Sequence, residues 1–83
     1  MSAKPKPPSK NPDPLNPREV LAFQIRSLRV AKGWSQEKLA LESELDRTYV
    51  SAVERCTWNI ALSNIEKLAR ALGVKPFELL MPP

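Results

Sequence analysis

Apolar residues recur at helical spacing along most of the chain. Leu21, Ile25 and Leu28 stand at i, i+4 and i+7, which is the core-facing stripe of an amphipathic helix. The segment 62–72 repeats this spacing with leucine, isoleucine and alanine. The sequence shows neither an alternating, strand-like pattern nor an internal repeat, so it predicts an all-α fold.

Residues with strong positional preferences divide this pattern into separate helices. Pro17 suits the first turn of a helix, where its missing N–H is not needed, and Gly33 suits the end of that helix. Ser35 and Asp46 are favourable N-caps, so they predict a second helix and, after a short turn, a third. Their spacing makes both of these helices short.

Two further helices complete the predicted fold. The apolar segment 62–72 is followed by Gly73, a typical helix C-terminus. Residues 75–80 then read KPFELL, with Pro76 placed to begin a short fifth helix. We therefore predict a compact all-α bundle of five short helices.

The third helix has an unusual outer surface. Successive helical residues are about 100° apart, so its two sides follow directly from the sequence ESELDRTYVSAVER over residues 42–55. One side carries Tyr49, Val50 and Val53; the other carries Thr48, Ser51, Ala52 and Arg55, with Arg47 on the flank. Small hydroxyl groups and arginines suit contact with a polar, negatively charged partner.

The N-terminal segment is rich in proline and lysine. Residues 1–17 contain six prolines, which block helix interiors and remove backbone donors. Lys4, Lys6 and Lys10 outnumber Asp13, so the segment is net positive. We predict a flexible, extended arm over 1–17 and a separate folded helical domain over 18–83. The arm either contacts phosphates or a groove, or is a solvated tail.

Composition narrows the classes of function. The 83 residues carry a formal charge of +4 and a pI of about 9.6, which favours an anionic partner. One cysteine and no histidine predict neither an internal disulfide nor a metal site nor a cofactor. No nucleophile has a positioned base, so an enzyme is not expected. The lack of an apolar run of about 20 residues and of a secretory signal favours the cytoplasm and no membrane partner.

Two short helices joined by a tight turn, the second with a small polar outer face, indicate a helix-turn-helix motif. The major groove of DNA is about 12 Å wide and admits one such helix. Residues near the N-terminus of that helix then reach the edges of the bases. The predicted partner is double-stranded DNA, and residues 18–83 are predicted to form a helix-turn-helix DNA-binding and dimerisation domain.

The sequence resembles the phage-repressor-like helix-turn-helix family of the xenobiotic-response-element type. The resemblance runs from about Ile25 to Leu80 and is carried by IRSLRVAKGWSQEKLA, LDRTYVSAVER, NIEKLARALGV and FELL. Within this family, the small size and the run DRTYVSAVER are most similar to controller proteins of restriction–modification systems. The combination of the four pieces is much more specific than any one of them.

The resemblance implies roles for individual residues. The positions that read bases in relatives are occupied by Arg47, Thr48 and Ser51. The positions that contact the DNA backbone or support reading are occupied by Gln36, Tyr49, Arg55, Thr57, Trp58 and Asn59. A structural ion pair of relatives corresponds to Arg29 and Glu54. Relatives commonly dimerise through the C-terminal region, and a short helix cannot bury Phe77, Leu79 and Leu80 together, so these three are expected at a homodimer interface.

Several of these residues keep more than one interpretation. Arg55 suits either a phosphate contact or plain exposure to solvent, and the Tyr49 hydroxyl either reaches a phosphate or belongs to a packed ring. Trp58 suits backbone contact, dimer contact or the core. Glu44 and Cys56 stand where relatives often have glycine, so a left-handed backbone is expected at Glu44; Cys56 is interpreted as a small residue ending a helix rather than a redox thiol.

The resulting hypothesis is a homodimeric, sequence-specific transcriptional regulator that binds a palindromic operator. Activation or repression depends on where the operator lies relative to a promoter. A hypothesis from another class is an antitoxin that binds a toxin and regulates its own operon, in which the proline-rich arm grips the toxin. Neighbouring genes discriminate the two: a restriction endonuclease and methyltransferase favour the first, and a toxin gene favours the second.

Overall fold

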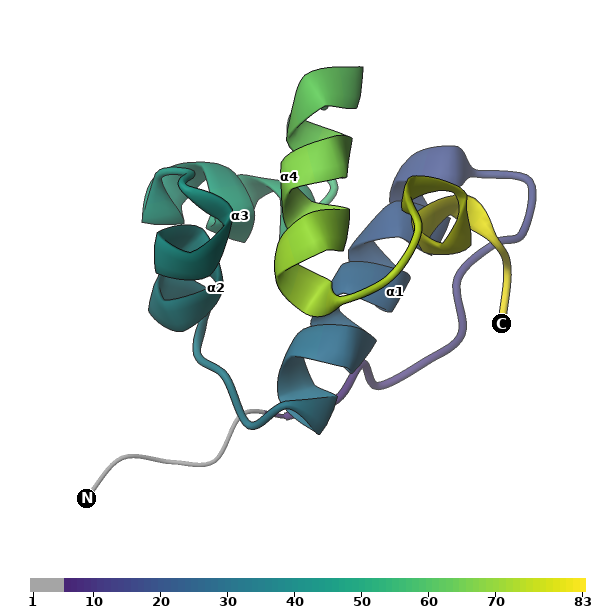
Figure 1. Ribbon diagram of the computed structural model, residues 1–83. Helices are drawn as coiled ribbons and strands as arrows, with labels where there is room; N and C mark the ends of the chain where they lie inside the picture. Colours follow the sequence, from purple (N-terminus) through teal and green to yellow (C-terminus); the bar gives the residue numbers. More distant parts are fainter. Residues whose placement is uncertain (1–5) are drawn as a thin grey trace.

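The computed structural model describes residues 6–83, which fold into helices connected by short turns (Figure 1). The helices are α1 (Pro17–Ala31), α2 (Gln36–Ser43), α3 (Arg47–Glu54), α4 (Leu62–Leu72) and the 3-10 helix η1 (Pro76–Leu80). The described range contains no strand, so the all-α class is confirmed. Residues 1–5 of the predicted arm, with Lys4, lie outside the described residues.

The predicted count of five α-helices is not confirmed. Residues 6–83 form four α-helices, and the fifth element, η1, is a 3-10 helix of five residues. Its hydrogen bonds close the shorter i to i+3 turn, as in Glu78 N–H to the Lys75 carbonyl at 2.9 Å. The segment from Pro76 to the end of η1 is too short to establish an α-helical hydrogen-bond ladder.

Side-chain caps mark where α1, α2 and α3 begin, and those of α2 and α3 are the residues that the sequence predicted. The Ser35 hydroxyl accepts a hydrogen bond from the Lys38 amide at 3.0 Å, and the Asp46 carboxylate accepts one from the Thr48 amide at 2.7 Å. At α1 the N-cap is Asn16, directly before Pro17. Each cap satisfies an amide that the helix leaves without an internal partner.

Two residues other than glycine adopt left-handed backbone conformations. Glu44, in the turn between α2 and α3, has φ 60° and ψ 37°, and Cys56, just after α3, has φ 60°. A side chain in this region costs about 1–2 kcal/mol. The sequence resemblance implies glycine at both positions, and the expected left-handed backbone at Glu44 is confirmed.

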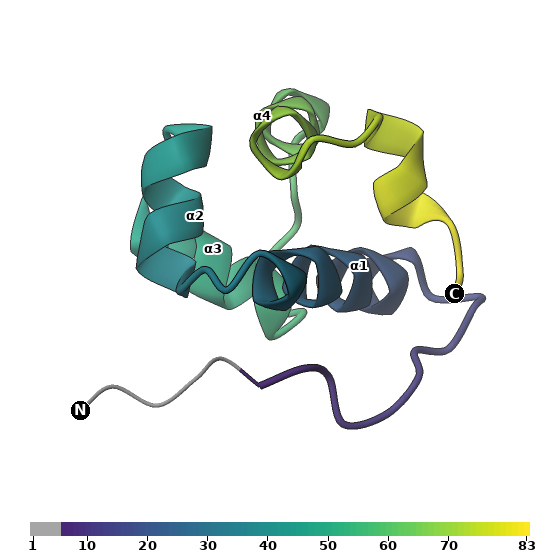
Figure 2. The same cartoon turned by 60° about the horizontal axis from the view of Figure 1, so that its bottom comes forward.

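The core lies between α1 and α4, with the α2–α3 pair on one side and η1 on the other (Figure 2). Each element contributes a side chain that is completely buried: Ile25, Leu39, Val50, Leu68 and Leu79. The α2–α3 pair is therefore anchored by its inner side, and the outer side of α3 is free. No helix within residues 6–83 is long and apolar enough to cross a membrane.

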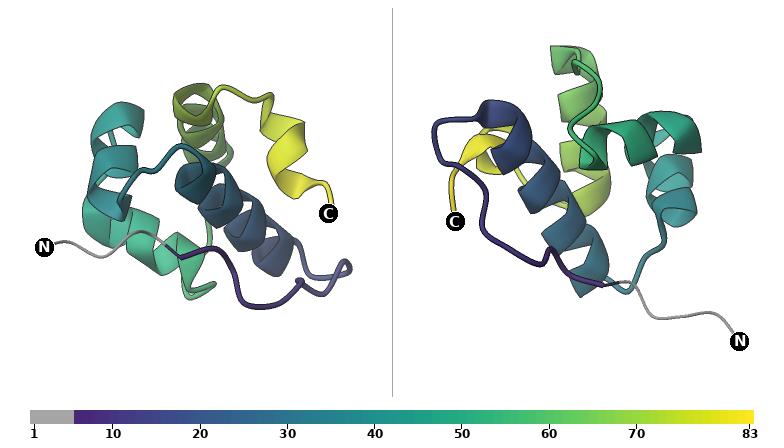
Figure 3. Two further views of the ribbon diagram at one scale, coloured as in Figure 1. Left: turned by 90° about the horizontal axis from the view of Figure 1, so that it is seen from below. Right: turned by 180° about the vertical axis from the view of Figure 1, so that it is seen from behind.

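Residues 6–16, which precede α1 in the sequence, contain no helix or strand and run alongside α1 (Figure 3). Arg26 Nε donates a hydrogen bond to the Lys6 carbonyl at 3.0 Å, and Glu19 accepts one from the Asp13 amide at 3.2 Å. Residues 6–16 therefore rest on the domain through these contacts, and the flexible arm over 1–17 stays a prediction.

The left-handed turn residue predicts a stabilising substitution. Glu44→Gly removes the steric strain of a side chain at φ 60°, and we expect the free energy of unfolding to rise by about 0.5–1 kcal/mol. Lys67→Gly, at a partly exposed position inside α4, should instead lower it by about 1 kcal/mol. Urea unfolding of the two variants measures both effects; a loss of stability in Glu44→Gly would contradict the strain argument.

Candidate nucleic-acid interface

Helix α3 presents a polar outer side next to a packed inner side. Arg47 and Thr48 are exposed, Ser51 is partly exposed, and Val50 and Val53 are buried in the core. The prediction that Ala52 lies on the outer side is wrong, because this residue has no exposed surface. The chain turns back over it after α3: the Thr57 amide and hydroxyl both donate to the Ala52 carbonyl, at 3.1 and 3.0 Å.

The outer side of α3 combines hydroxyl groups with two arginines. Arg47 stands at the first position of the helix, and Arg55 follows its last residue. One guanidinium nitrogen of Arg55 donates to the Ser51 hydroxyl, so this arginine lies along the helix surface. Such a surface matches a base edge or a phosphate in charge and hydrogen bonding.

A buried ion pair fixes α3 against α1. Arg29 donates to both carboxylate oxygens of Glu54, with Nε to Oε2 at 2.7 Å and Nη2 to Oε1 at 2.9 Å. The two side chains are only 6% and 2% exposed. The remaining Arg29 nitrogen, Nη1, donates to the Trp34 carbonyl at 2.8 Å. This hydrogen bond connects α1 to the turn between α1 and α2.

Gln36, the first residue of α2, joins the same cluster. Its side-chain amide donates to Glu54 Oε1 at 3.1 Å, and the residue is partly buried. The structure therefore places Gln36 in a supporting position behind α3, with its amide nitrogen engaged by Glu54. One carboxylate thus receives hydrogen bonds from α1 and α2 and holds both helices of the motif in register.

Tyr49 and Trp58 pack against each other at the inner edge of α3. Their ring centroids are 5.9 Å apart with an angle of 60° between the planes, an edge-to-face arrangement. The Tyr49 hydroxyl is buried and has no hydrogen-bond partner within the described residues. This geometry corresponds to the packed-ring interpretation of Tyr49, while Trp58 stays 48% exposed.

The loop after α3 is tied to the start of α1. Thr57 and Asn59 are exposed, and the Asn59 side-chain oxygen accepts a hydrogen bond from an Arg18 guanidinium nitrogen. The Cys56 thiol lies 3.6 Å from the Arg18 carbonyl. Sequence reasoning missed Arg18, because nothing in the local pattern connects two residues that are 41 positions apart.

The Cys56 thiol has a low tendency to ionise. Its partial burial raises its pKa above the ordinary value, and the Glu19 carboxylate raises this pKa further, although Arg18 opposes the shift. A thiol that stays protonated is a poor nucleophile and a poor metal ligand. Within residues 6–83, no group of acidic, cysteine or histidine side chains is arranged to hold a metal ion.

An apolar groove opens between α4 and η1. Its volume is about 340 Å³, and it is lined by Leu62, Ile65, Glu66, Pro76, Phe77 and Leu80. Phe77 and Leu80 are 59% and 42% exposed, but Leu79 is fully buried in the core, which removes it from the expected dimer interface. η1 turns this side chain inward between α1 and α4. Leu62 was predicted on the apolar stripe of the fourth helix, but as the first residue of α4 it lies at the rim of the groove and is 76% exposed.

Known proteins resemble this chain closely over most of its length. A helix-turn-helix family profile matches residues 25–79. Control protein C.BamHI of Bacillus amyloliquefaciens is 50% identical over 66 residues, 78% of this chain and 82% of that protein. The crystal structure of the hypothetical transcription factor NHTF from Neisseria has a TM-score of 0.94 at 61% identity and covers 96% of this chain and 90% of that one.

A related structure includes DNA. The restriction–modification controller protein C.Esp1396I, a tetramer in complex with its natural 35-base-pair operator, has a TM-score of 0.69 at 38% identity. The match covers 76% of this chain and 87% of that one. At this identity the likeness extends to sequence as well as fold.

The buried ion pair predicts a large loss of stability when one partner is removed. Arg29→Met leaves the Glu54 carboxylate buried without its counter-charge, so we expect the free energy of unfolding to fall by about 3–5 kcal/mol. Replacing both partners, as in Arg29→Met with Glu54→Leu, should restore part of this loss. Urea unfolding gives the comparison.

The exposed ion pair of α2 provides the control. Lys38 and Glu42 are 3.0 Å apart with side chains 45% and 41% exposed, so solvent screens their attraction. Lys38→Met should therefore change stability by less than about 1 kcal/mol. The single variants Arg29→Met and Glu54→Leu are measured beside the double variant. If the double variant loses as much free energy of unfolding as the two single variants together, the ion-pair account is contradicted.

Proposed function

The chain belongs to the helix-turn-helix family of DNA-binding transcriptional regulators, and we propose that it acts as a homodimer on a palindromic operator. The controller proteins of restriction–modification systems are the relatives that support this form of the proposal. Whether a bound dimer activates or represses depends on where the operator lies relative to the promoter. Such a regulator works on DNA in the cytoplasm.

The outer side of α3 is the observation that carries this proposal. Arg47 and Thr48 are exposed at the start of the helix and Ser51 is partly exposed one turn later, while the inner side is anchored in the core. An eight-residue helix presented in this way fits the major groove with its N-terminal residues toward the bases. We assign base reading to these three residues.

The neighbouring residues supply contacts to the DNA backbone or support for them. Arg55, Thr57 and Asn59 are exposed at the end of α3 and in the following loop, where a duplex lying against α3 would bring its phosphates. Trp58 lies between them with half its surface exposed. Gln36 and Tyr49 have supporting roles, because one is hydrogen-bonded to Glu54 and the other packs on Trp58.

The apolar groove between α4 and η1 is the proposed dimer interface. Leu62, Phe77 and Leu80, which line it, are all more than two-fifths exposed. In a symmetric dimer the groove of each copy would pack against the same surface of the other copy. Two copies joined by a two-fold axis present two α3 helices to successive turns of the major groove, about 34 Å apart. This spacing requires an inverted repeat in the operator.

Two other functions receive less support. The relatives described above are named as control proteins or transcription factors, which does not support toxin binding as the main role of this chain. Catalysis would require an activated nucleophile or a metal. Burial raises the pKa of the Cys56 thiol, which does not favour an activated nucleophile there.

Base reading by Arg47 predicts a loss of sequence preference on substitution. Arg47→Ala should weaken binding to a duplex selected from a random pool by about 1–3 kcal/mol and relax the preference at one base position in each half-site. Arg70→Ala, which removes an exposed arginine from α4, should leave the preference unchanged. Fluorescence anisotropy on the selected duplex and on its single-base variants measures both; equal effects of the two substitutions would refute the assignment of Arg47.

The groove predicts that charge at its rim produces monomers. Leu62→Glu places a carboxylate where the partner's apolar surface should pack, and we expect a shift from dimer to monomer with weaker binding to an inverted repeat. Leu41→Glu is the matched control, because this leucine is 72% exposed on α2 and does not line the groove. Sedimentation velocity gives the oligomeric state; a dimer that survives Leu62→Glu would place the interface elsewhere.

A further inference from the structure

The N-terminal segment 6–16 is tied to α1 near both of its ends. Arg26 holds the Lys6 carbonyl at 3.0 Å, and Glu19 holds the Asp13 amide at 3.2 Å. Four prolines lie in this segment and fix φ in the range of extended backbone. A segment that is already restricted gives up little further entropy when it contacts a partner.

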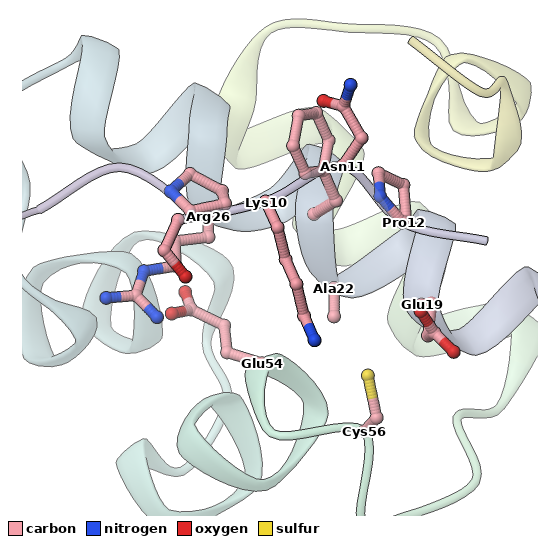
Figure 4. A pocket seen from close by; sticks show the side chains of 11 residues that line it. Lys10, Asn11, Pro12, Glu19, Ala22, Arg26, Glu54 and Cys56 are labelled. Carbon is pink, nitrogen blue, oxygen red and sulfur yellow. The ribbon is translucent and has the colours of Figure 1, made fainter. Parts of the chain in front are cut away.

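The segment runs beside the end of the proposed recognition helix. Residues 8–12 and α1 enclose an open groove of about 200 Å³, whose lining also includes Glu54 and Cys56 at the end of α3. In Figure 4 the Lys10 side chain extends from the segment toward Glu54 and Cys56. Seen from below (Figure 3, left), the segment and α3 lie on the same side of the molecule.

Two lysines of the segment form no ion pair within residues 6–83. These residues, Lys6 and Lys10, are both exposed. Glu54, the carboxylate at the end of α3, is already occupied by Arg29 and Gln36. Because both lysines are exposed and form no ion pair within residues 6–83, each can bind an external anion.

A further cation links the segment to the loop after α3. Arg18, at the start of α1, is exposed and donates to Asn59. Arg55 lies on the outer side of α3 just before this loop. Arg55 and Arg18 thus place positive charge between the outer side of α3 and the lysines of the segment.

We propose that residues 6–16 form a second DNA-contacting element, in which Lys6 and Lys10 bind phosphates flanking the groove that α3 occupies. This inference rests on the proposed function, because the duplex must lie against α3. Double-stranded DNA carries about one negative charge per 1.7 Å of its axis, so a basic element beside α3 meets phosphates as soon as the duplex is seated. Such contacts add affinity and salt sensitivity but no sequence preference.

The test compares two pairs of charge-neutralising substitutions in the full chain. Lys6→Gln with Lys10→Gln removes the two charges of the segment; Lys67→Gln with Arg70→Gln removes two charges from α4, on the other side of α1 (Figure 2). Dissociation constants for a duplex selected from a random pool, and for a scrambled duplex, are measured from about 50 to 200 mM salt. Removing one lysine–phosphate interaction reduces the slope of log Kd against log salt by about 0.9.

A dimer loses two phosphate interactions if one of the two lysines in each protomer contacts DNA, and four if both do. We therefore expect the slope of log Kd against log salt to fall by about 1.8–3.6 in the variant with Lys6→Gln and Lys10→Gln. Its preference for the selected over the scrambled duplex should stay that of the wild type, and the α4 variant should keep the wild-type slope. An unchanged slope in the arm variant, or an equal decrease in both variants, overturns the arm proposal and leaves the proposed function standing. A wild-type chain that retains no duplex from the pool overturns the proposed function, and the arm proposal with it.

Discussion

Glu54 receives hydrogen bonds from Arg29 of α1 and Gln36 of α2, and this cluster determines how α3 is presented. The carboxylate is almost completely buried, so its charge is stable only while the arginine stays in place. Because the same arginine also holds the Trp34 carbonyl, three helices and one connection share a single set of contacts. The outer side of α3 can carry polar residues because the contacts of Glu54 with α1 and α2 fix the orientation of the helix.

The outer surface of the molecule divides into two sides with different chemistry. One side carries the hydroxyls and arginines of α3, the loop 57–59 and the basic segment 6–16; the other carries the apolar groove between α4 and η1. Polar and positive surface suits a duplex, whereas exposed apolar surface suits a second copy of the chain. A small domain can thus bind DNA on one side while dimerising on another.

Local chemistry explains what the sequence could predict. The starts of α2 and α3 followed from Ser35 and Asp46, since a cap depends only on residues two or three positions away. The ion pair of Arg29 and Glu54 came from the family resemblance, because no periodicity connects residues 25 positions apart. The burial of Ala52 and Leu79 was not predictable, because each is covered by a segment that packs over it only in the folded chain. The contact of residues 6–16 with α1 depends in the same way on tertiary structure.

The proposed function requires that α3 reads DNA bases in a symmetric pair. The most direct measurement is the set of sequences that the wild-type chain enriches from a random duplex pool. We expect a common inverted repeat whose half-sites are centred about 10 base pairs, one helical turn, or a multiple of that apart. Enrichment of a single unrepeated motif, or of no common sequence, would contradict this mode of binding.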